Sequence, residues 1–220
     1  MITDDPGTPG DGHWEFNILW NYEHAAGAAE SEAPLLDFAY GIGERLQLKY
    51  EVPWVVVDGV GSTLGNSSIG AKWRFVDSGD RGWRVSTYPQ FEFNYPGSDA
   101  AERGLAQPGH SYSLPLEFER GFENFTLGLE VGRAFSSRDE DQWFGGVVLL
   151  RELAPGFEAQ LELHGDSSVG FGRTTVTANV GAVWALAEHG ALVFSVGRDF
   201  HDALNGGKRT IATLGWQISH

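Results

Sequence analysis

Strict alternation of apolar and polar residues is the feature that most constrains the fold of this chain. In the first such segment Trp14, Phe16 and Ile18 share one side of an extended strand, and Glu15 and Asn17 share the other. A helix, with about 3.6 residues per turn, would scatter these side chains around its axis. The alternation therefore predicts a β-strand with one apolar and one polar face.

The same pattern returns along most of the 220 residues. Its segments lie at 14–23, 36–42, 46–54, 68–75, 90–95, 112–119, 125–132, 143–153, 157–164, 176–184, 192–196 and 214–218. The segment 143–153 is the least regular, so the pattern constrains least which of its side chains share a face. The pattern predicts an all-β chain.

Short and long connections alternate between these segments. The short ones lie at 43–45, 77–82, 121–124, 154–156 and 187–190. The generally longer, polar and glycine-rich ones lie at 25–33, 58–66, 96–110, 136–142, 165–173 and 201–207. Bacterial outer-membrane barrels have short periplasmic turns, longer outer loops and an even strand count. With both termini periplasmic, we expect a transmembrane antiparallel up-and-down β-barrel of about twelve strands.

Composition restricts the alternatives. No stretch approaches the roughly 20 apolar residues of a membrane helix, so a membrane span would have to be a closed barrel. The absence of cysteine excludes a disulfide scaffold. A net charge of -15 argues against a nucleic-acid partner, because phosphate binding needs a surplus of Lys and Arg.

The apolar face is expected to contact lipid, whereas a soluble barrel would bury it. The opposite face is rich in Gly, Ser, Ala and Thr as well as charge, which suits a crowded or water-containing lumen. Aromatic residues near the strand ends would form girdles at the two membrane interfaces. The expected girdle residues are Trp14, Trp54, Trp73, Trp83, Tyr95, Tyr112, Trp184 and Trp216.

The inward charges are sorted along the chain. The basic ones come first and the acidic ones follow: Lys49, Lys72, Arg74, Arg84, then Glu117, Glu119, Glu130, Glu158 and Glu162. This order predicts a basic and an acidic wall that together impose a transverse field at a constriction. The alternative is that these groups pair across a closed lumen, because buried charges are normally paired.

Evidence for catalysis or a cofactor is weak. The residues His164, Asp166, Ser167 and Ser168 lie near one strand end. Sequence proximity alone does not place a nucleophile within hydrogen-bond distance of a base, so we expect that the protein is not an enzyme. The seven histidines have no metal-ligand spacing, so no metal is assigned. Glycine pairs such as Gly41 and Gly43 precede no helix, so no nucleotide or other cofactor is expected.

The first twelve residues differ from the remainder. Their prolines, glycines and Asp4, Asp5 and Asp11 exclude a strand, so we divide the chain into a flexible segment, 1–12, and a barrel, 13–220. The segment is either a periplasmic tail or a plug inserted into the lumen. No apolar signal segment follows Met1, and we expect a mature sequence from which the signal peptide is absent.

Several stretches carry a resemblance to a known family. They are 2–10, 12–15, 34–40, 41–54 and 64–74, the last reading Leu-Gly-Asn-Ser-Ser-Ile-Gly-Ala-Lys-Trp-Arg. In them the chain resembles outer-membrane β-barrel proteins of the MetA-pathway phenol-degradation or transporter family. The resemblance covers most of the chain and is sharpest in its first third. It implies an outer-membrane barrel and identifies no substrate. The chain ends in His220, where such barrels typically end in an aromatic residue.

The leading functional hypothesis is a narrow channel for small solutes, because twelve strands fall between packed eight-stranded barrels and open 16-stranded porins. Aromatic and cationic solutes are the candidate substrates. A lipid-modifying hydrolase and a sealed structural or adhesion barrel are the alternatives. The expected location is the outer membrane of a Gram-negative bacterium. The expected partners are outer-membrane lipid, lipopolysaccharide, the barrel-assembly machinery and an unknown small solute.

Overall fold

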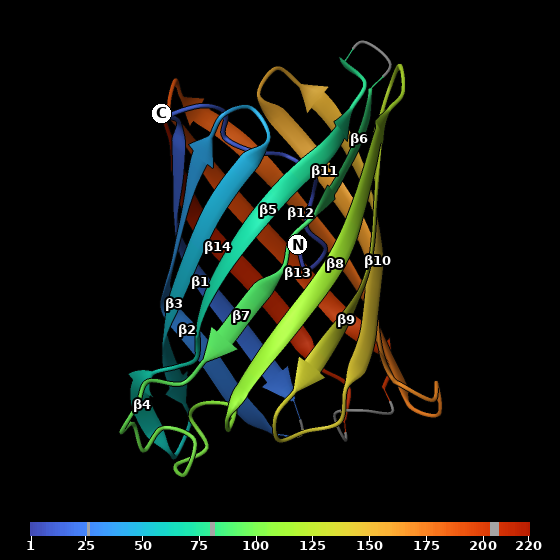
Figure 1. The fold of residues 1–220 in the computed structure, drawn as a ribbon. Coiled ribbons are helices and arrows are strands. Elements are labelled where there is room, and N and C mark those ends of the chain that lie inside the picture. The colour runs from blue at the N-terminus through green and yellow to red at the C-terminus, as the bar shows by residue number, and fades with distance from the viewer. Residues whose placement is uncertain (26, 80–81, 203–206) are drawn as a thin grey trace.

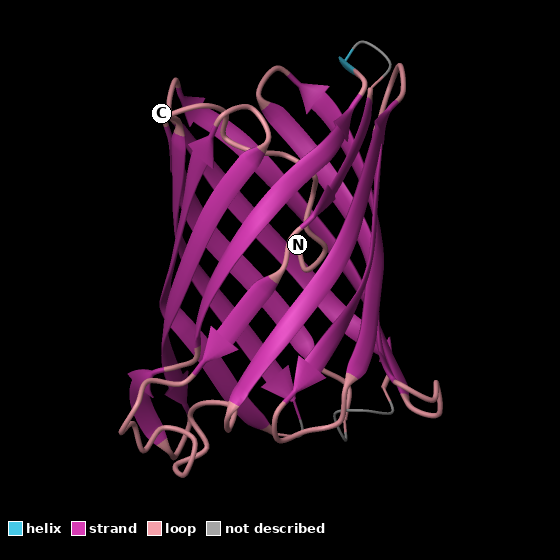
Figure 2. Cartoon of the chain, viewed as in Figure 1, coloured by secondary structure: helices cyan, strands magenta, loops and turns pink. Residues whose placement is uncertain are grey.

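The strands of the computed structural model follow one another around a closed antiparallel barrel in up-and-down order (Figure 1, Figure 2). The structure describes residues 1–25, 27–79, 82–202 and 207–220. The strands are β1 (Trp14–Ala25), β2 (Ala28–Ile42), β3 (Leu46–Val57), β4 (Gly61–Leu64), β5 (Ser67–Asp77), β6 (Trp83–Thr87), β7 (Gln90–Phe93), β8 (His110–Gly121), β9 (Thr126–Ser136), β10 (Gln142–Ala154), β11 (Phe157–Ser168), β12 (Thr174–Ala187), β13 (Gly190–His201) and β14 (Thr210–Ser219).

Pairing of the first strand with the last closes the sheet. Ile18 of β1 lies opposite Leu36 of β2 on one side and opposite Trp216 of β14 on the other. β6 and β7 share one position, because both pair with β5 and with β8. Among the described strands, β4 pairs with β3 alone and lies outside the barrel. The barrel therefore has twelve strand positions, which confirms the predicted fold class and strand count.

The interruption between β6 and β7 falls at Tyr88 and Pro89. Proline has no N–H group, so it cannot donate a hydrogen bond to a neighbouring strand. The carbonyl of Pro89 still accepts a hydrogen bond from the Ala71 N–H at 3.1 Å, so the neighbouring strand continues past the break. The Tyr88 side chain is 1% exposed.

The predicted short turns lie at one end of the barrel together with the C-terminus (Figure 1, upper end). Three of the predicted outer loops are wrong in part. β2 already begins at Ala28, β4 lies within 58–66 and pairs with the end of β3, and β11 continues to Ser168. The strands there extend with small and polar residues, which the alternation rule does not recognise as strand. Residues 26, 80–81 and 203–206 of the predicted connections lie outside the described residues.

Burial is inverted relative to a water-soluble protein. Leu48, Ile69 and Leu161 are 50%, 54% and 58% exposed, whereas Lys72 and Glu117 are 2% and 0% exposed. Apolar side chains thus cover the outer face of the barrel, and polar side chains fill its interior. This arrangement is the one expected of a barrel surrounded by lipid. Among the described residues, no helix has the length and apolarity needed to cross a membrane.

Candidate functional site in the barrel lumen

The N-terminal segment lies inside the barrel (Figure 1). Both carboxylate oxygens of Glu162 accept a hydrogen bond from the Ile2 N–H at 3.0 Å, and one accepts from the Thr3 N–H at 2.5 Å. Asn179 donates a further hydrogen bond to Glu162 at 3.0 Å. The Thr3 hydroxyl lies 3.2 Å from Nδ1 of His164. One carboxylate of β11 thereby binds the start of the chain.

A second anchor lies on the opposite side of the segment. The Lys72 ammonium lies 3.0 Å from the Asp4 carboxylate and 3.6 Å from the Glu117 carboxylate. It also donates to the backbone carbonyl of Asp5. Ser86 donates to Glu117. Lys72 is thus shared between the barrel wall and the segment.

The electrostatics of this anchor favour an ionised Asp4. Burial opposes ionisation, but the ammonium groups of Lys72 and Lys49 outweigh it and lower the pKa of Asp4 to about 2. The Asp4 carboxylate is therefore charged at neutral pH.

The close approach of the segment to the wall requires two strand glycines. A Cβ atom on Gly146 would overlap the Thr3 side chain, and one on Gly41 would overlap the backbone of Gly10. Farther along, the Gly43 N–H donates to Asp11 at 2.8 Å, and Gly12 donates to the Gly41 carbonyl at 3.2 Å. These contacts guide the segment along the β2–β3 turn and into β1.

Each predicted basic group of the lumen forms an ion pair. Lys49 lies 3.3 Å from Asp37 and 2.8 Å from Glu51. The remaining pairs are Lys72 with Asp4 and Glu117, Arg74 with Asp77, and Arg84 with Glu119. Only the pairs of Lys72 with Glu117 and of Arg84 with Glu119 join members of the predicted basic and acidic sets. Pairing across a closed lumen stays a hypothesis. A transverse field across the lumen stays a prediction.

The acidic residues on the polar face outnumber the basic ones. Glu130, Glu158 and Glu162 form no salt bridge with the described residues, although Glu162 binds the segment and Glu158 accepts from Gln160 at 3.1 Å. The Asp37 and Glu51 carboxylates add to this excess over Lys49. The lumen therefore has a surplus of carboxylates.

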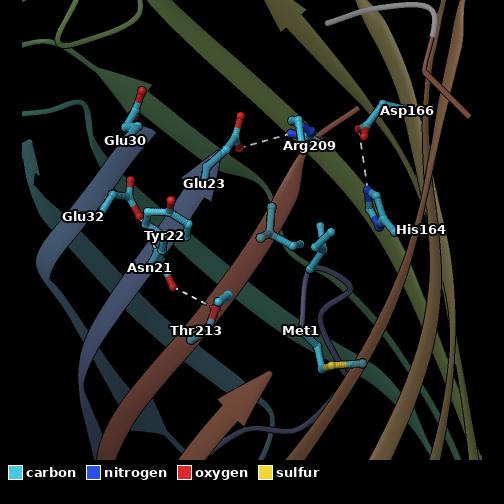
Figure 3. Close-up of a pocket in the computed structure, with 13 residues that line it drawn as sticks. Met1, Asn21, Tyr22, Glu23, Glu30, Glu32, His164, Asp166, Arg209 and Thr213 are labelled. Carbon is cyan, nitrogen blue, oxygen red and sulfur yellow. Dashed lines mark hydrogen bonds and ion pairs between the residues drawn. The ribbon is translucent and has the colours of Figure 1, made fainter. Parts of the chain in front are cut away.

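Cavities lie on both sides of the segment. The outer one has a volume of about 430 Å³ and is lined by Glu23, Glu30, Glu32 and Asp166, with Arg209 as its basic group (Figure 3). Arg209 lies 3.5 Å from Glu23, and His164 Nε2 lies 3.6 Å from Asp166. Met1 lies at its inner boundary (Figure 3), and Ile2 also lines it.

The inner cavity has a volume of about 460 Å³. Its wall includes Arg84, Glu119 and Glu158, and its outer boundary includes Met1 and Asp4. The two cavities therefore meet at the N-terminal segment, which is the structural element that separates them.

Sequence reasoning missed several of these lumen residues. Asp37 sits between Leu36 and Phe38, so the alternation could have assigned it to the inner face. Tyr88 stands at the strand break, and its ring lies 5.8 Å from the Lys49 ammonium and 5.2 Å from that of Lys72. No periodic signal marks it.

The expected girdle residues occupy two bands on the outer face. Trp54, Trp73, Trp83, Tyr112 and Trp184 are exposed, and Trp14, Tyr95 and Trp216 are half-buried. Trp54, Tyr95 and Tyr112 lie toward the outer loops, and the others lie toward the short turns. Their contact with membrane interfaces stays a prediction.

The residues considered for hydrolysis do not assemble a catalytic pair. His164 contacts Thr3 and Asp166. The Ser167 hydroxyl donates a hydrogen bond to the Arg173 carbonyl at 3.1 Å and lies 3.0 Å from the Thr174 hydroxyl. No group of three or more His, Asp or Glu in the described part of the chain has the geometry of a metal site.

Comparison with known proteins identifies the fold class. No family model and no curated protein sequence matches the chain. Among solved structures, the COG4313 outer membrane channel from Pseudomonas putida F1 superposes with a TM-score of 0.75 at 14% identity, over 100% of both chains. The NanC porin gives 0.69 at 9% identity over 92% of this chain and 98% of that one, and the KdgM porin gives 0.65 at 13% over 93% and 99%.

The chain thus has the fold of the outer-membrane β-barrel proteins. At these identities the likeness concerns the fold alone, and the resemblance to the MetA-pathway family is not confirmed by a family model.

Proposed function

We propose that this chain is a narrow outer-membrane channel for small solutes, with a preference for cations, and that residues 1–12 occupy its bore as a plug. The observation that carries the proposal is the polar lumen with a cavity of about 430 Å³ on one side of the segment and about 460 Å³ on the other. A sealed structural barrel has no need of such cavities, because packed side chains could fill it.

The surplus of luminal carboxylates supports the cation preference. A lumen lined by one sign of charge raises the local concentration of the opposite ion. Glu158 is the informative position, because Glu117 and Glu119 are paired with Lys72 and Arg84 and Glu162 binds the N-terminal segment.

The names of the structural neighbours, "outer membrane channel" and "porin", agree with this proposal. One neighbour was solved as a porin in complex with oligogalacturonate, which concerns that protein. We further propose that the chain is located in the outer membrane of a Gram-negative bacterium and is related to the MetA-pathway family. Its proposed partners are outer-membrane lipid, lipopolysaccharide and the barrel-assembly machinery.

The test is a planar bilayer recording under a potassium chloride gradient with the purified chain. We expect a small cation-selective current, which should increase when residues 2–8 are deleted. The variant Glu158→Gln should shift the reversal potential toward zero. Glu188→Gln, in the exposed 187–190 turn, removes a carboxylate outside the lumen and is the matched control.

The possible outcomes separate the alternatives. Anion selectivity, or a reversal potential that Glu158→Gln leaves unchanged, would contradict the acidic lumen. No current from the intact chain or from the deletion variant would support the sealed barrel. Hydrolysis of dispersed phospholipid that His164→Ala abolishes would favour the enzyme.

A further inference from the structure

Arg120 is a charged residue on the lipid-facing side of the barrel. In β8 the side chains alternate, so that Glu119 faces inward and is 5% exposed whereas Arg120 faces outward. Its cross-strand neighbours are Trp83 of β6 and Leu127 of β9. Arg120 precedes the short turn to β9, so it lies at the barrel end that the short turns and the C-terminus occupy.

Two aromatic rings hold the Arg120 guanidinium. Its central carbon lies 4.7 Å from the Trp83 ring centroid and 4.9 Å from that of Phe122. Phe122 in turn stacks on Phe125, with centroids 4.6 Å apart and planes at 17°. Aromatic contacts engage the faces of a guanidinium and leave the N–H groups at its edge available for an anion.

No counter-charge for Arg120 is found among the described residues, since none of their salt bridges includes it. Arg133 provides a comparison within the same sheet. It is also held by two rings, at 4.9 Å from Phe135 and 5.4 Å from Trp143, but its guanidinium lies 3.0 Å from the Asp141 carboxylate. One of two similar arginines is thus neutralised by the protein, and the other has no acidic partner among the residues that the structure describes.

We propose that Arg120, with Trp83 and Phe122, binds the phosphate group of a phospholipid in the membrane leaflet next to the short turns. A guanidinium matches a phosphate through paired N–H···O hydrogen bonds. Trp83 and Phe122, which are 41% and 42% exposed, would contact the glycerol and upper acyl region. The site rests on the membrane location proposed above and does not depend on conductance.

Native mass spectrometry of the detergent-purified chain, titrated with phosphatidylglycerol, tests this site. We expect a bound lipid whose occupancy falls about fivefold in Arg120→Gln, the effect of one basic residue near an anionic lipid surface. Arg151→Gln is the matched control, because Arg151 is an exposed outward residue of β10 near the same end and has no cation–π contact with a described aromatic residue. A diacylglycerol with the same acyl chains, which has no phosphate, should bind the original chain and Arg120→Gln equally.

Arg120→Lys keeps the charge but not the planar fork, and should retain only part of the binding. A heat-modifiability gel reports the folded state of every variant. Equal losses in Arg120→Gln and Arg151→Gln would contradict a specific site, as would unchanged binding in Arg120→Gln or a diacylglycerol that distinguishes the variants. Because lipid binding is read without ion flow, a lipid site could be confirmed in a barrel that carries no current.

Discussion

Replacement of Glu162 by Gln should release the start of the chain from the barrel wall. Glu162 is 3% exposed and accepts hydrogen bonds from two successive backbone N–H groups, of Ile2 and Thr3. A hydrogen bond to a charged group contributes about 1.5–3 kcal/mol. Gln retains one carbonyl acceptor, so the variant should lose about one such contribution. The ratio of bound to released segment should then fall about tenfold to a hundredfold.

A spin label can follow this release, because the chain has no cysteine and Ile2→Cys creates a unique attachment point. The Ile2 side chain is 40% exposed and borders the outer cavity, so a label there need not displace the wall. In the otherwise unchanged chain we expect an immobilised spectrum. Glu162→Gln should add a mobile component and increase access of a water-soluble relaxation agent.

Glu158→Gln is the matched control for this experiment. It removes a carboxylate from the same face of the same strand, and its hydrogen bond is to Gln160 and not to the segment. The reasoning is refuted if the label stays equally immobile in Glu162→Gln, or if Glu158→Gln mobilises it to the same extent. The first result would mean that Glu162 does not anchor the segment, and the second that luminal charge alone governs it.

Two further predictions concern the barrel surface and pH. Leu161→Arg, near the middle of β11 on the outer face, should lower the free energy of unfolding in lipid by about 2–4 kcal/mol. Gln160→Arg, which faces the inner cavity, should change this free energy little. Equal losses in urea titrations would contradict the assignment of the outer face to lipid. Because the Asp4 pKa is lowered from 3.8 to about 2, its ion pair with Lys72 contributes fully above pH 3.8 and is lost as the pH falls through about 2. The Ile2 label should become mobile over that interval, and Asp4→Asn should remove the step.

The barrel was predictable because its signal is local. Alternation assigns each residue to a face without knowledge of its neighbours in space, and turns set the number of strands. The same rule failed at Ala28–Ala33, because the residues of both faces there are small or polar and no apolar–polar alternation is present. The β6–β7 break had a local signal in Pro89, but continued alternation at Phe91 and Phe93 concealed it.

The ion pairs of the lumen were not predictable in the same way. Alternation places Lys72 and Glu117 on the inner face, but their contact depends on the register of the intervening strands, and a shift by one residue would reverse every facing. Arg84 and Glu119 are direct cross-strand partners only because β6 pairs with β8 in the observed register. The net surplus of carboxylates follows from composition, whereas the locations of the neutral and the charged regions follow from pairing.

The position of residues 1–12 depends on contacts about 160 residues away, so no local pattern could have distinguished a plug from a tail. Nevertheless the barrel sequence holds complementary features. Glu162 and Lys72 supply the charges that bind the segment, and Gly41 and Gly146 leave the space where a Cβ atom would overlap it. If the segment left, Lys72 would still have Glu117 at 3.6 Å as a partner, so the wall is not left with an uncompensated cation. A wall that fits the segment and keeps Lys72 paired without it is compatible with two states of the bore.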